Sequence, residues 1–122
     1  MEFTKEVTDA LLVRSCEPGR IRIGETWHDE HLIIARDRVI APWQVEDPAG
    51  ITTTTLEQAL DLQPEILLIG TGSNYVMCDV LLIGELARRG VGTEIMDTAA
   101  ACRTYNVLVH EQRSVVAALY NA

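Results

Sequence analysis

The sequence predicts an α/β protein of mixed α+β type, and three observations lead to this fold class. Of the 122 residues, 48% are hydrophobic and 23% are charged, which is typical of a globular chain. Residues up to about Pro48 form short apolar runs between turn signals, as β-strands do. The remainder shows a strand–helix–strand–helix–strand pattern, which predicts parallel strands joined by right-handed crossovers. The length fits one domain, so we expect residues 1–122 to form a single domain.

The first predicted strands flank a turn. Residues 11–13 are apolar, and Glu17-Pro18-Gly19 follows as a turn signal, because proline fixes φ and glycine admits positive φ. Residues 20–23 (RIRI) then alternate as a half-buried strand does.

A hairpin is predicted next. The apolar residues 32–35 and 39–41 flank the charged segment 36–38 (RDR), which indicates two paired strands and a tight turn. Pro42 argues against a central strand that continues beyond this point, because proline lacks the backbone donor.

The second part begins with a predicted short helix and a buried strand. Thr54-Thr55-Leu56-Glu57 fits a capping box, in which a threonine and a glutamate side chain satisfy free backbone amides. The helix is expected to run through Leu60 and to end before Pro64. Residues 65–69 (EILLI) are nearly all apolar, which predicts a strand buried on both faces.

Residues 79–89 are predicted to form a helix. Val80, Ile83 and residues 86–87 fall on one apolar stripe, which we expect to face the core. Gly90 suits a left-handed residue after the last turn.

The chain is expected to close with a strand, a helix and a strand. The strand covers residues 93–96, Asp97 and Thr98 form an N-cap pair, the helix runs to about His110, and the last strand covers residues 114–119. The buried face of the helix is predicted from its spacing of three to four residues: Ala101, Cys102, Tyr105, Leu108 and Val109.

Charge and cysteine usage exclude several functional classes. A net charge of −8 argues against nucleic acid and anionic membrane partners, which need clustered basic residues. The three cysteines and three histidines form no CxxC or zinc pattern, so we expect no metal, no cofactor and reduced thiols. The longest apolar run, near residues 80–83, is too short to span a membrane, and residues 1–6 are unlike a targeting peptide. These features predict a soluble, cytoplasmic protein.

Two loops at the carboxyl ends of consecutive parallel strands form the candidate ligand site. Such loops lie at one edge of an open α/β sheet, beside a helix N-terminus that attracts anions. The candidate residues are Gly70, Thr71, Gly72, Ser73, Asp97, Thr98 and Arg103. Each also has a simpler interpretation. The glycines suit a tight turn, because Tyr75 replaces the third glycine of a dinucleotide fingerprint and no P-loop lysine follows. Asp97 and Thr98 suit a helix cap.

We predict no catalytic residue. Cys102 shares the apolar face of its helix and lies beyond the first turn, which favours a buried structural thiol over a nucleophile. His28 and His31 indicate a hairpin tip rather than a metal site, because no third ligand is identifiable. Trp43 and Asn106 are candidate partner contacts, with a core position and a solvated helix face as the respective alternatives.

Three segments resemble the family of mitochondrial complex I assembly factor 3 and its bacterial homologues. They are residues 64–72 (PEILLIGTG), 90–92 (GVG) and 94–108 (EIMDTAAACRTYNVL). The resemblance implies a compact three-layer fold with an N-terminal β-hairpin layer, a mixed sheet containing a βαβαβ unit, and a helical layer. It also implies a protein that binds other proteins and has no established enzymatic step. The chain departs from many relatives at residues 73–78 (SNYVMC), where they carry a basic or proline-containing stretch.

These observations favour a non-catalytic binding or assembly protein, similar to complex I assembly factors, with unidentified protein partners. The alternative is a small-molecule or anion-binding enzyme that uses the edge formed by residues 70–73 and 97–103.

Overall fold

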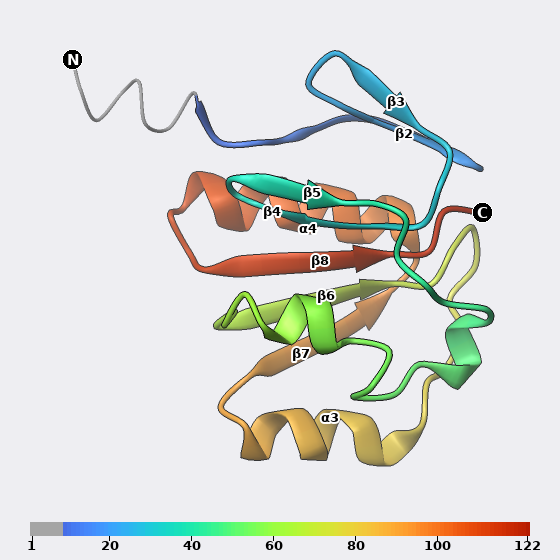
Figure 1. Ribbon diagram of the computed structural model, residues 1–122, viewed down its shortest axis with the longest axis vertical. Helices are drawn as coiled ribbons and strands as arrows, with labels where there is room; N and C mark the ends of the chain where they lie inside the picture. Colours follow the sequence, from blue (N-terminus) through green and yellow to red (C-terminus); the bar gives the residue numbers. More distant parts are fainter. Residues whose placement is uncertain (1–8) are drawn as a thin grey trace.

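The computed structural model describes residues 9–122, which form two β-sheets and several helices (Figure 1). The strands of the antiparallel three-stranded sheet are β1 (Val13–Glu17), β2 (Arg20–Ile23) and β3 (Thr26–His28). The five-stranded sheet contains β4 (Leu32–Ala35), β5 (Arg38–Ile40), β6 (Ile66–Gly70), β7 (Gly92–Met96) and β8 (Val115–Leu119). The helices are α2 (Glu57–Leu60), α3 (Val80–Arg88), α4 (Thr98–His110) and a 3-10 turn at Pro48–Gly50. The expectation that residues 1–6 carry no targeting signal lies outside the described residues.

The five-stranded sheet confirms the predicted mixed topology. Its strand order is β5-β4-β8-β6-β7. Strand β6 runs parallel to both its neighbours, β7 and β8, while β4 runs antiparallel to β8 and β5. The predicted βαβαβ unit is therefore present, with α3 and α4 as its crossovers. The predicted hairpin around residues 36–38 is present as β4 and β5, and β5 ends at Ile40, before Pro42.

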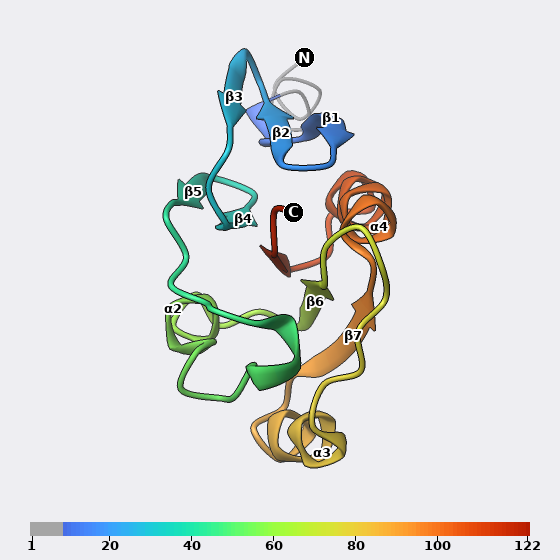
Figure 2. The same cartoon turned by 90° about the vertical axis from the view of Figure 1, so that its right-hand side faces the viewer.

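The five-stranded sheet lies between two apolar layers (Figure 2). One face is covered by α4 and by the three-stranded sheet, and the opposite face by α2, α3 and the segment 43–56. Alternate residues of β6 pack into the two layers: Leu67 and Ile69 face α2 and α3, and Leu68 faces α4. This alternation explains why the strand reads as one continuous apolar run, and it confirms the prediction of burial on both faces.

Helix α4 is fixed along its whole length by side-chain contacts. Its buried residues include Ala101, Cys102, Tyr105 and Val109, so the predicted face is confirmed, with Leu108 partly buried. The Tyr105 hydroxyl donates to the Leu11 carbonyl at 2.9 Å. In the last turn, Arg36 Nη2 donates to the Val109 carbonyl at 2.9 Å, where a positive charge is favourable beside the helix C-terminus.

The predicted capping box of α2 is wrong. The helix contains only residues 57–60, and its N-cap is Leu56, which makes no side-chain hydrogen bond. The hydroxyls of Thr52 and Thr55 are 3.1 Å apart and bond each other instead. Local hydrogen bonds among the threonines therefore replace the cap, as short polar side chains often do in turns.

The apolar stripe of α3 also differs from the prediction. Its bounds match, Asp79 caps its start by accepting from the Leu81 amide at 2.9 Å, and Gly90 has a φ of +82°. Leu86 is buried as predicted, and Leu82 is buried as well, but Val80, Ile83 and Ala87 of the predicted stripe are exposed. The reason is tertiary: α3 packs against the edge strand β7, which covers only a narrow stripe of the helix.

The segment after β3 is not a hairpin tip. Residues 29–31 connect β3, in the small sheet, to β4, in the large one, and β3 itself was not predicted. Among residues 9–122, no helix has the length and apolar character needed to cross a lipid bilayer.

Candidate functional site

The edge where β6 and β7 end and α4 begins brings several of the predicted site residues together. Asp97 is the N-cap of α4, and its carboxylate accepts from the Ala100 amide at 2.8 Å. The prediction that Asp97 caps the helix is confirmed. Thr98, which was paired with Asp97 in that prediction, is instead the first helical residue and is buried.

The Thr98 hydroxyl links three segments of this edge. It accepts from the Gly72 amide at 2.7 Å and donates to the Tyr120 carbonyl at 2.7 Å. The Thr98 amide in turn donates to the Gly72 carbonyl at 2.9 Å. Gly70 lies so close that an added Cβ would be 2.9 Å from Thr98 Cα, so only glycine fits there. Gly70 and Thr98 therefore serve close packing between strand and helix.

A second buried threonine shapes the loop after β6. Thr71 Oγ1 donates to the Asn74 carbonyl at 2.7 Å and accepts from the Val76 amide at 3.0 Å. Gly72 has a φ of +101°, which favours glycine. The segment is a tight turn whose buried polar groups already have partners.

A cavity of about 140 Å³ opens at this edge. Of the seven predicted ligand-site residues, Gly72, Ser73 and Thr98 line it. The other lining residues come from the end of β1 and the turn after it, the first turn of α4 and the C-terminal segment: Cys16, Glu17, Pro18, Ala99, Asn121 and Ala122. The Ser73 hydroxyl donates to the main-chain oxygen of Ala122 at 2.7 Å, so it too is engaged within the protein.

Arg103 lies at a neighbouring cavity of about 270 Å³. Cys16 and Ala99 line both cavities, which places the two side by side along α4. Arg103 is exposed, and none of the ion pairs within residues 9–122 includes it. Gly70, Thr71 and Asp97 line neither cavity.

The two predicted partner contacts are used inside the fold. Trp43 is 1% exposed, and its indole Nε1 donates to the Thr55 carbonyl at 2.9 Å. The expectation that Trp43 contacts a partner is therefore wrong, because the ring is enclosed by the core. The Asn106 amide accepts from the Val13 amide at 2.9 Å and donates to the Val13 carbonyl at 2.8 Å, which ties β1 to α4.

The histidine segment is organised around the C-terminal residues. His31 Nδ1 accepts from the Asn121 amide at 2.8 Å, and its ring stacks on Tyr120 with centroids 4.1 Å apart. Burial lowers the pKa of His31. The Asn121 side chain also donates to the carbonyls of His28 and Glu30, each at 3.0 Å. Within the described part of the chain, no three His, Cys, Asp or Glu side chains are grouped to hold a metal ion.

Sequence reasoning missed that Cys16 lies beside Cys102. Cys102 is buried, as predicted, and lines the same cavity of about 270 Å³ as the half-buried Cys16 of β1. Interaction with the neighbouring Cys102 thiol and the positive charge of Arg103 outweigh burial and lower the pKa of Cys16 to about 7. The same contact and burial raise the pKa of Cys102. No sequence spacing could reveal this pair, because 86 positions separate the two residues (102 − 16).

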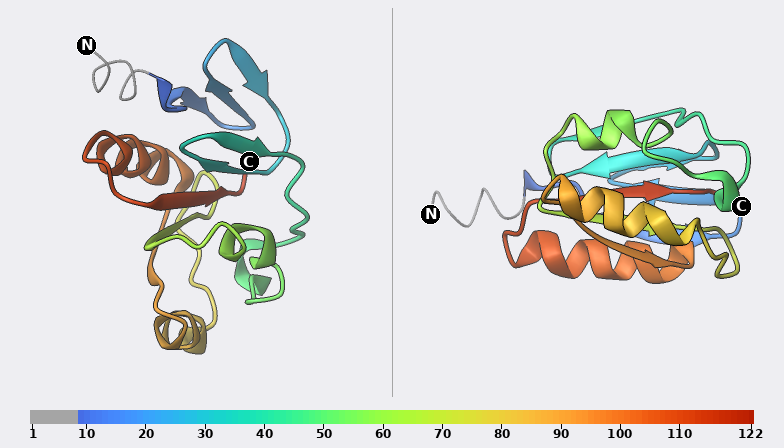
Figure 3. Two further views of the ribbon diagram at one scale, coloured as in Figure 1. Left: turned by 60° about the vertical axis from the view of Figure 1, so that its left-hand side comes forward. Right: turned by 90° about the horizontal axis from the view of Figure 1, so that it is seen from below.

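An exposed apolar surface on and before α3 was also missed. We call it the α3 surface, and its residues are Tyr75, Met77, Val80, Leu81 and Ile83. It lies on the opposite side of the sheet from α4 and the small sheet, and Figure 3 (right panel) looks directly onto α3. The apolar residues of α3 could have indicated this surface from the sequence, but they were predicted to face the core.

Comparison with known proteins places these features in context. A profile of the family described as "Protein of unknown function (DUF498/DUF598)" matches residues 13–120. NADH dehydrogenase (ubiquinone) 1 alpha subcomplex assembly factor 3 of Xenopus tropicalis is 35% identical and covers 78% of this chain, which spans 58% of that protein's length. The 13 kDa major membrane protein of Francisella tularensis subsp. holarctica is 34% identical and covers 78% of this chain and 76% of its own length.

The fold is shared with a solved structure. The crystal structure of a Bordetella parapertussis protein has a TM-score of 0.85 and 38% identity, covering 93% of this chain and 97% of that chain. Together, these similarities confirm both the resemblance and the fold class predicted from the residues.

Proposed function

Because this chain belongs to the DUF498/DUF598 family, whose profile spans nearly all of it, we propose that it is a non-catalytic protein that binds partner proteins during assembly. The similarity to complex I assembly factor 3 supports this proposal. In this chain, the main structural support for the proposal is the α3 surface.

The α3 surface is unusual because a helix normally turns its apolar side chains toward the core. Val80 and Leu81 are 77% and 68% exposed, whereas the next residue, Leu82, is buried. Each exposed aliphatic side chain forgoes about 1.5–3 kcal/mol of burial free energy. Contiguous exposed apolar residues are typical of protein interaction sites. The helix therefore presents on its outer side the contacts that a partner would bury.

The charge around this surface defines the partner further. Asp79 and Glu85 are exposed beside the apolar residues, Arg88 is exposed in the last turn of the same helix, and the whole chain carries a net charge of −8. Complementary potentials steer association and disfavour wrong partners. The partner that fits is a protein with an apolar groove and a basic rim.

The alternative, a small-molecule enzyme at the edge of α4, has less support. Ligand pockets generally enclose about 300–1,000 Å³. The cavity that contains Gly72, Ser73 and Thr98 encloses about 140 Å³, and the hydroxyls of Ser73 and Thr98 already have partners within the chain.

The proposal is tested by capturing bound proteins from native extract with the parent chain and with a Val80→Gln, Leu81→Gln double variant. The matched control is Val107→Gln, which alters an apolar residue that is 56% exposed on α4. We expect a specific set of proteins that is lost with the double variant and kept with the control. A bound set that survives the double variant but disappears with Ser73→Ala and Arg103→Gln would contradict the proposal and favour the alternative edge.

A further inference from the structure

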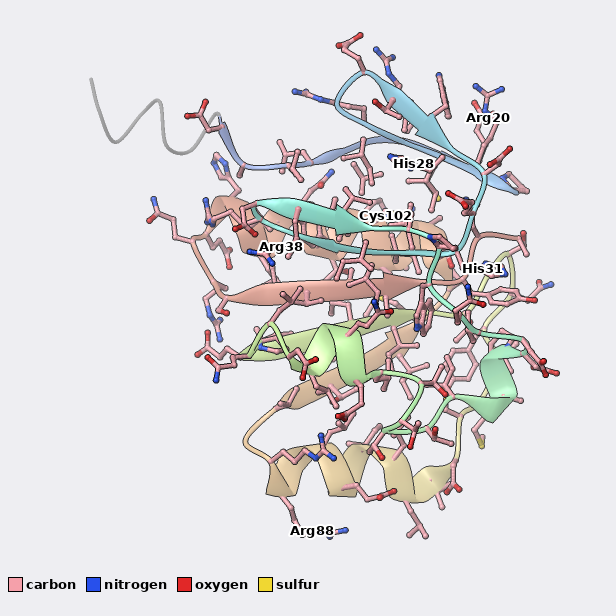
Figure 4. All side chains as sticks on the ribbon, in the orientation of Figure 1. Arg20, His28, His31, Arg38, Arg88 and Cys102 are labelled. Carbon is pink, nitrogen blue, oxygen red and sulfur yellow. The ribbon has the colours of Figure 1, made fainter. Side chains whose placement is uncertain are left out.

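We propose that Cys16 and Cys102 form a dithiol site for small disulfides that carry carboxylates. In this site Cys16 makes the first attack, and Cys102 then closes an internal disulfide. The inference is independent of the proposed partner surface, because the two cysteines and the α3 surface lie on opposite sides of the five-stranded sheet. Figure 4 labels Cys102 on α4 and Arg88 on α3, on either side of that sheet.

A β-bulge in β1 aims Cys16 at α4. Residues directly opposite each other in antiparallel strands point to the same side of the sheet, and the register shifts between Val13 and Ser15. This extra residue interrupts the alternation, as bulges do, so that Cys16 and not Ser15 faces inward. The pairs are Val13 with Ile23, Ser15 with Arg22, and Cys16 with Ile21. Since Ile21 and Ile23 are core residues packed near α4, Cys16 faces the same layer as Cys102.

The two thiols differ in access, as an attacking and a resolving thiol should. Cys16 is half-buried and lines both cavities at this edge, of about 140 and 270 Å³. Cys102 is 3% exposed and lines only the second cavity. A small disulfide therefore reaches Cys16 first.

The charges around the pair favour a thiolate at Cys16. Interaction with the Cys102 thiol has the largest effect and lowers the pKa of Cys16, burial raises it, Arg103 lowers it, and Asp97 raises it. Arg14 also lines the second cavity, while Glu17, the next residue of β1, is 3.8 Å from Arg20 and is partly neutralised by it. The two arginines at the cavity suit an incoming disulfide with carboxylate groups.

The chemistry is ordinary thiol–disulfide exchange. The Cys16 thiolate attacks one sulfur of the small disulfide, a new sulfur–sulfur bond forms, and the first small thiolate leaves with the electron pair of the broken bond. Cys102 then loses its proton to solvent and attacks the Cys16 sulfur, which expels the second small thiolate. Two protein thiols are oxidised to one disulfide, and the small disulfide is reduced to two thiols.

The first step prepares the second. Interaction with Cys16 is the largest cause of the raised pKa of Cys102, burial is the next, and the charge of the Cys16 thiolate adds to them. The Cys16 thiolate no longer exists once its sulfur is bound in a mixed disulfide, so its effect on the ionisation of Cys102 is lost and the effect of burial remains. The resolving thiol is thus inactive until its target has formed.

The test treats the reduced full-length protein with glutathione disulfide near pH 7 and follows it by intact-mass and peptide mass spectrometry. We expect the parent to end with a Cys16–Cys102 bond and no glutathione attached. Cys102→Ala should stop as the Cys16 mixed disulfide, and Cys16→Ala should lose the reaction. Cys78→Ala is the matched control, because Cys78 is a buried thiol on the other face of the sheet, and it should behave as the parent. Glutathione retained on Cys16 in the parent, or unchanged oxidation in Cys16→Ala, would overturn the proposal.

Two further measurements distinguish the proposed dithiol site from an accessible cysteine of ordinary reactivity. The midpoint of Cys16 alkylation should lie near pH 7, and so below the value of about 8.5 for free cysteine. Arg103→Gln should raise this midpoint, while Arg88→Gln on α3 should leave it unchanged. The parent should also react faster with anionic glutathione disulfide than with cationic cystamine, and Arg103→Gln should reduce that preference. A midpoint at or above 8.5, or no preference between the two disulfides, would contradict the proposed site.

Discussion

At the scale of single residues, Thr98 shows how one hydroxyl can hold an edge together. It accepts from the amide of one loop and donates to the carbonyl of the C-terminal segment, so three chain segments meet at a single side chain. The sequence pattern indicated a cap, and the neighbouring Asp97 takes that role alone. The connections of Thr98 are to Gly72 and Tyr120, 26 and 22 positions away, so no local pattern could predict them.

The first prediction separates the two residues. Asp97→Ala removes an N-cap and should lower the free energy of unfolding by about 0.5–2 kcal/mol. Thr98→Val leaves the buried Gly72 amide without its partner and should cost about 1–3 kcal/mol. Urea unfolding of both variants and the parent measures this. Stability equal to that of the parent in both variants would show that these hydrogen bonds do not hold the edge.

The second prediction concerns His31 and acidification. Burial lowers the pKa of His31 from its ordinary value of 6.5, so the folded protein holds the imidazole neutral and its Nδ1 accepts the Asn121 amide. As the pH falls below about 6.5, the unfolded chain takes up this proton before the folded one does, and the free energy of unfolding decreases. His31→Phe keeps an aromatic ring against Tyr120 but cannot titrate. Thermal unfolding from pH 8 to pH 5 should therefore show a steeper loss in the parent than in the variant, and parallel profiles would contradict this.

At the scale of elements, the contact between β6 and α4 is set by Gly70. A Cβ at this position would lie 2.9 Å from both Cα and Oγ1 of Thr98. Gly70→Ala should therefore force the helix and strand apart and cost about 1–3 kcal/mol of stability. Gly50→Ala is the matched control, since a Cβ there meets nothing within 4 Å. Chemical denaturation should show a loss for Gly70→Ala only, and equal midpoints in both variants would disprove the close contact.

In helix α3, by contrast, a glycine can be replaced without a steric clash. Gly84 lies in its middle, and an added Cβ would approach only Arg88 Nη1, at 3.9 Å. Gly84→Ala should therefore raise the free energy of unfolding by about 0.5–1 kcal/mol, because glycine is a poor helix former. A melting temperature below that of the parent would indicate that the helix is strained or differently packed at this position.

Elements with complete local signals were predictable from the sequence. The strand near residues 65–69 has a continuous apolar run, and α4 has a capping residue and a regular buried face. The failures concern tertiary coverage. Nothing in the sequence of α3 shows that an edge strand would cover only Leu82 and Leu86, and the short β3 carries too few residues for a clear pattern.

At the scale of the whole molecule, the sequence predicted where the candidate site lies but not all the residues that form it. The rule that loops gather at the carboxyl edge of parallel strands correctly brought Gly72, Ser73 and Thr98 to one cavity. That rule carries no information about the small sheet, which adds Cys16 from the other end of the chain to the same cavity. The Cys16–Cys102 contact depends on a bulge and on the packing of two layers, so it required the fold.

The two sides of the molecule differ in structure. The edge at α4 is tightly bonded and offers two small cavities, whereas α3 offers an open apolar face. A protein that acts by binding partners through α3 should tolerate changes at Ser73 better than changes at Leu81. This comparison depends on both variants remaining folded, which circular dichroism can verify.

Photo-crosslinking at single positions shows whether a partner protein contacts the α3 surface. A photoreactive amino acid replaces Leu81, which is 68% exposed, in one version of the protein and Val107, an apolar residue on α4 that is 56% exposed, in the other. After irradiation in native extract, mass spectrometry identifies the attached proteins. We expect a defined crosslinked protein from position 81 and only background from position 107. The same background at both positions, or a defined product from position 107 alone, would contradict a partner surface on α3.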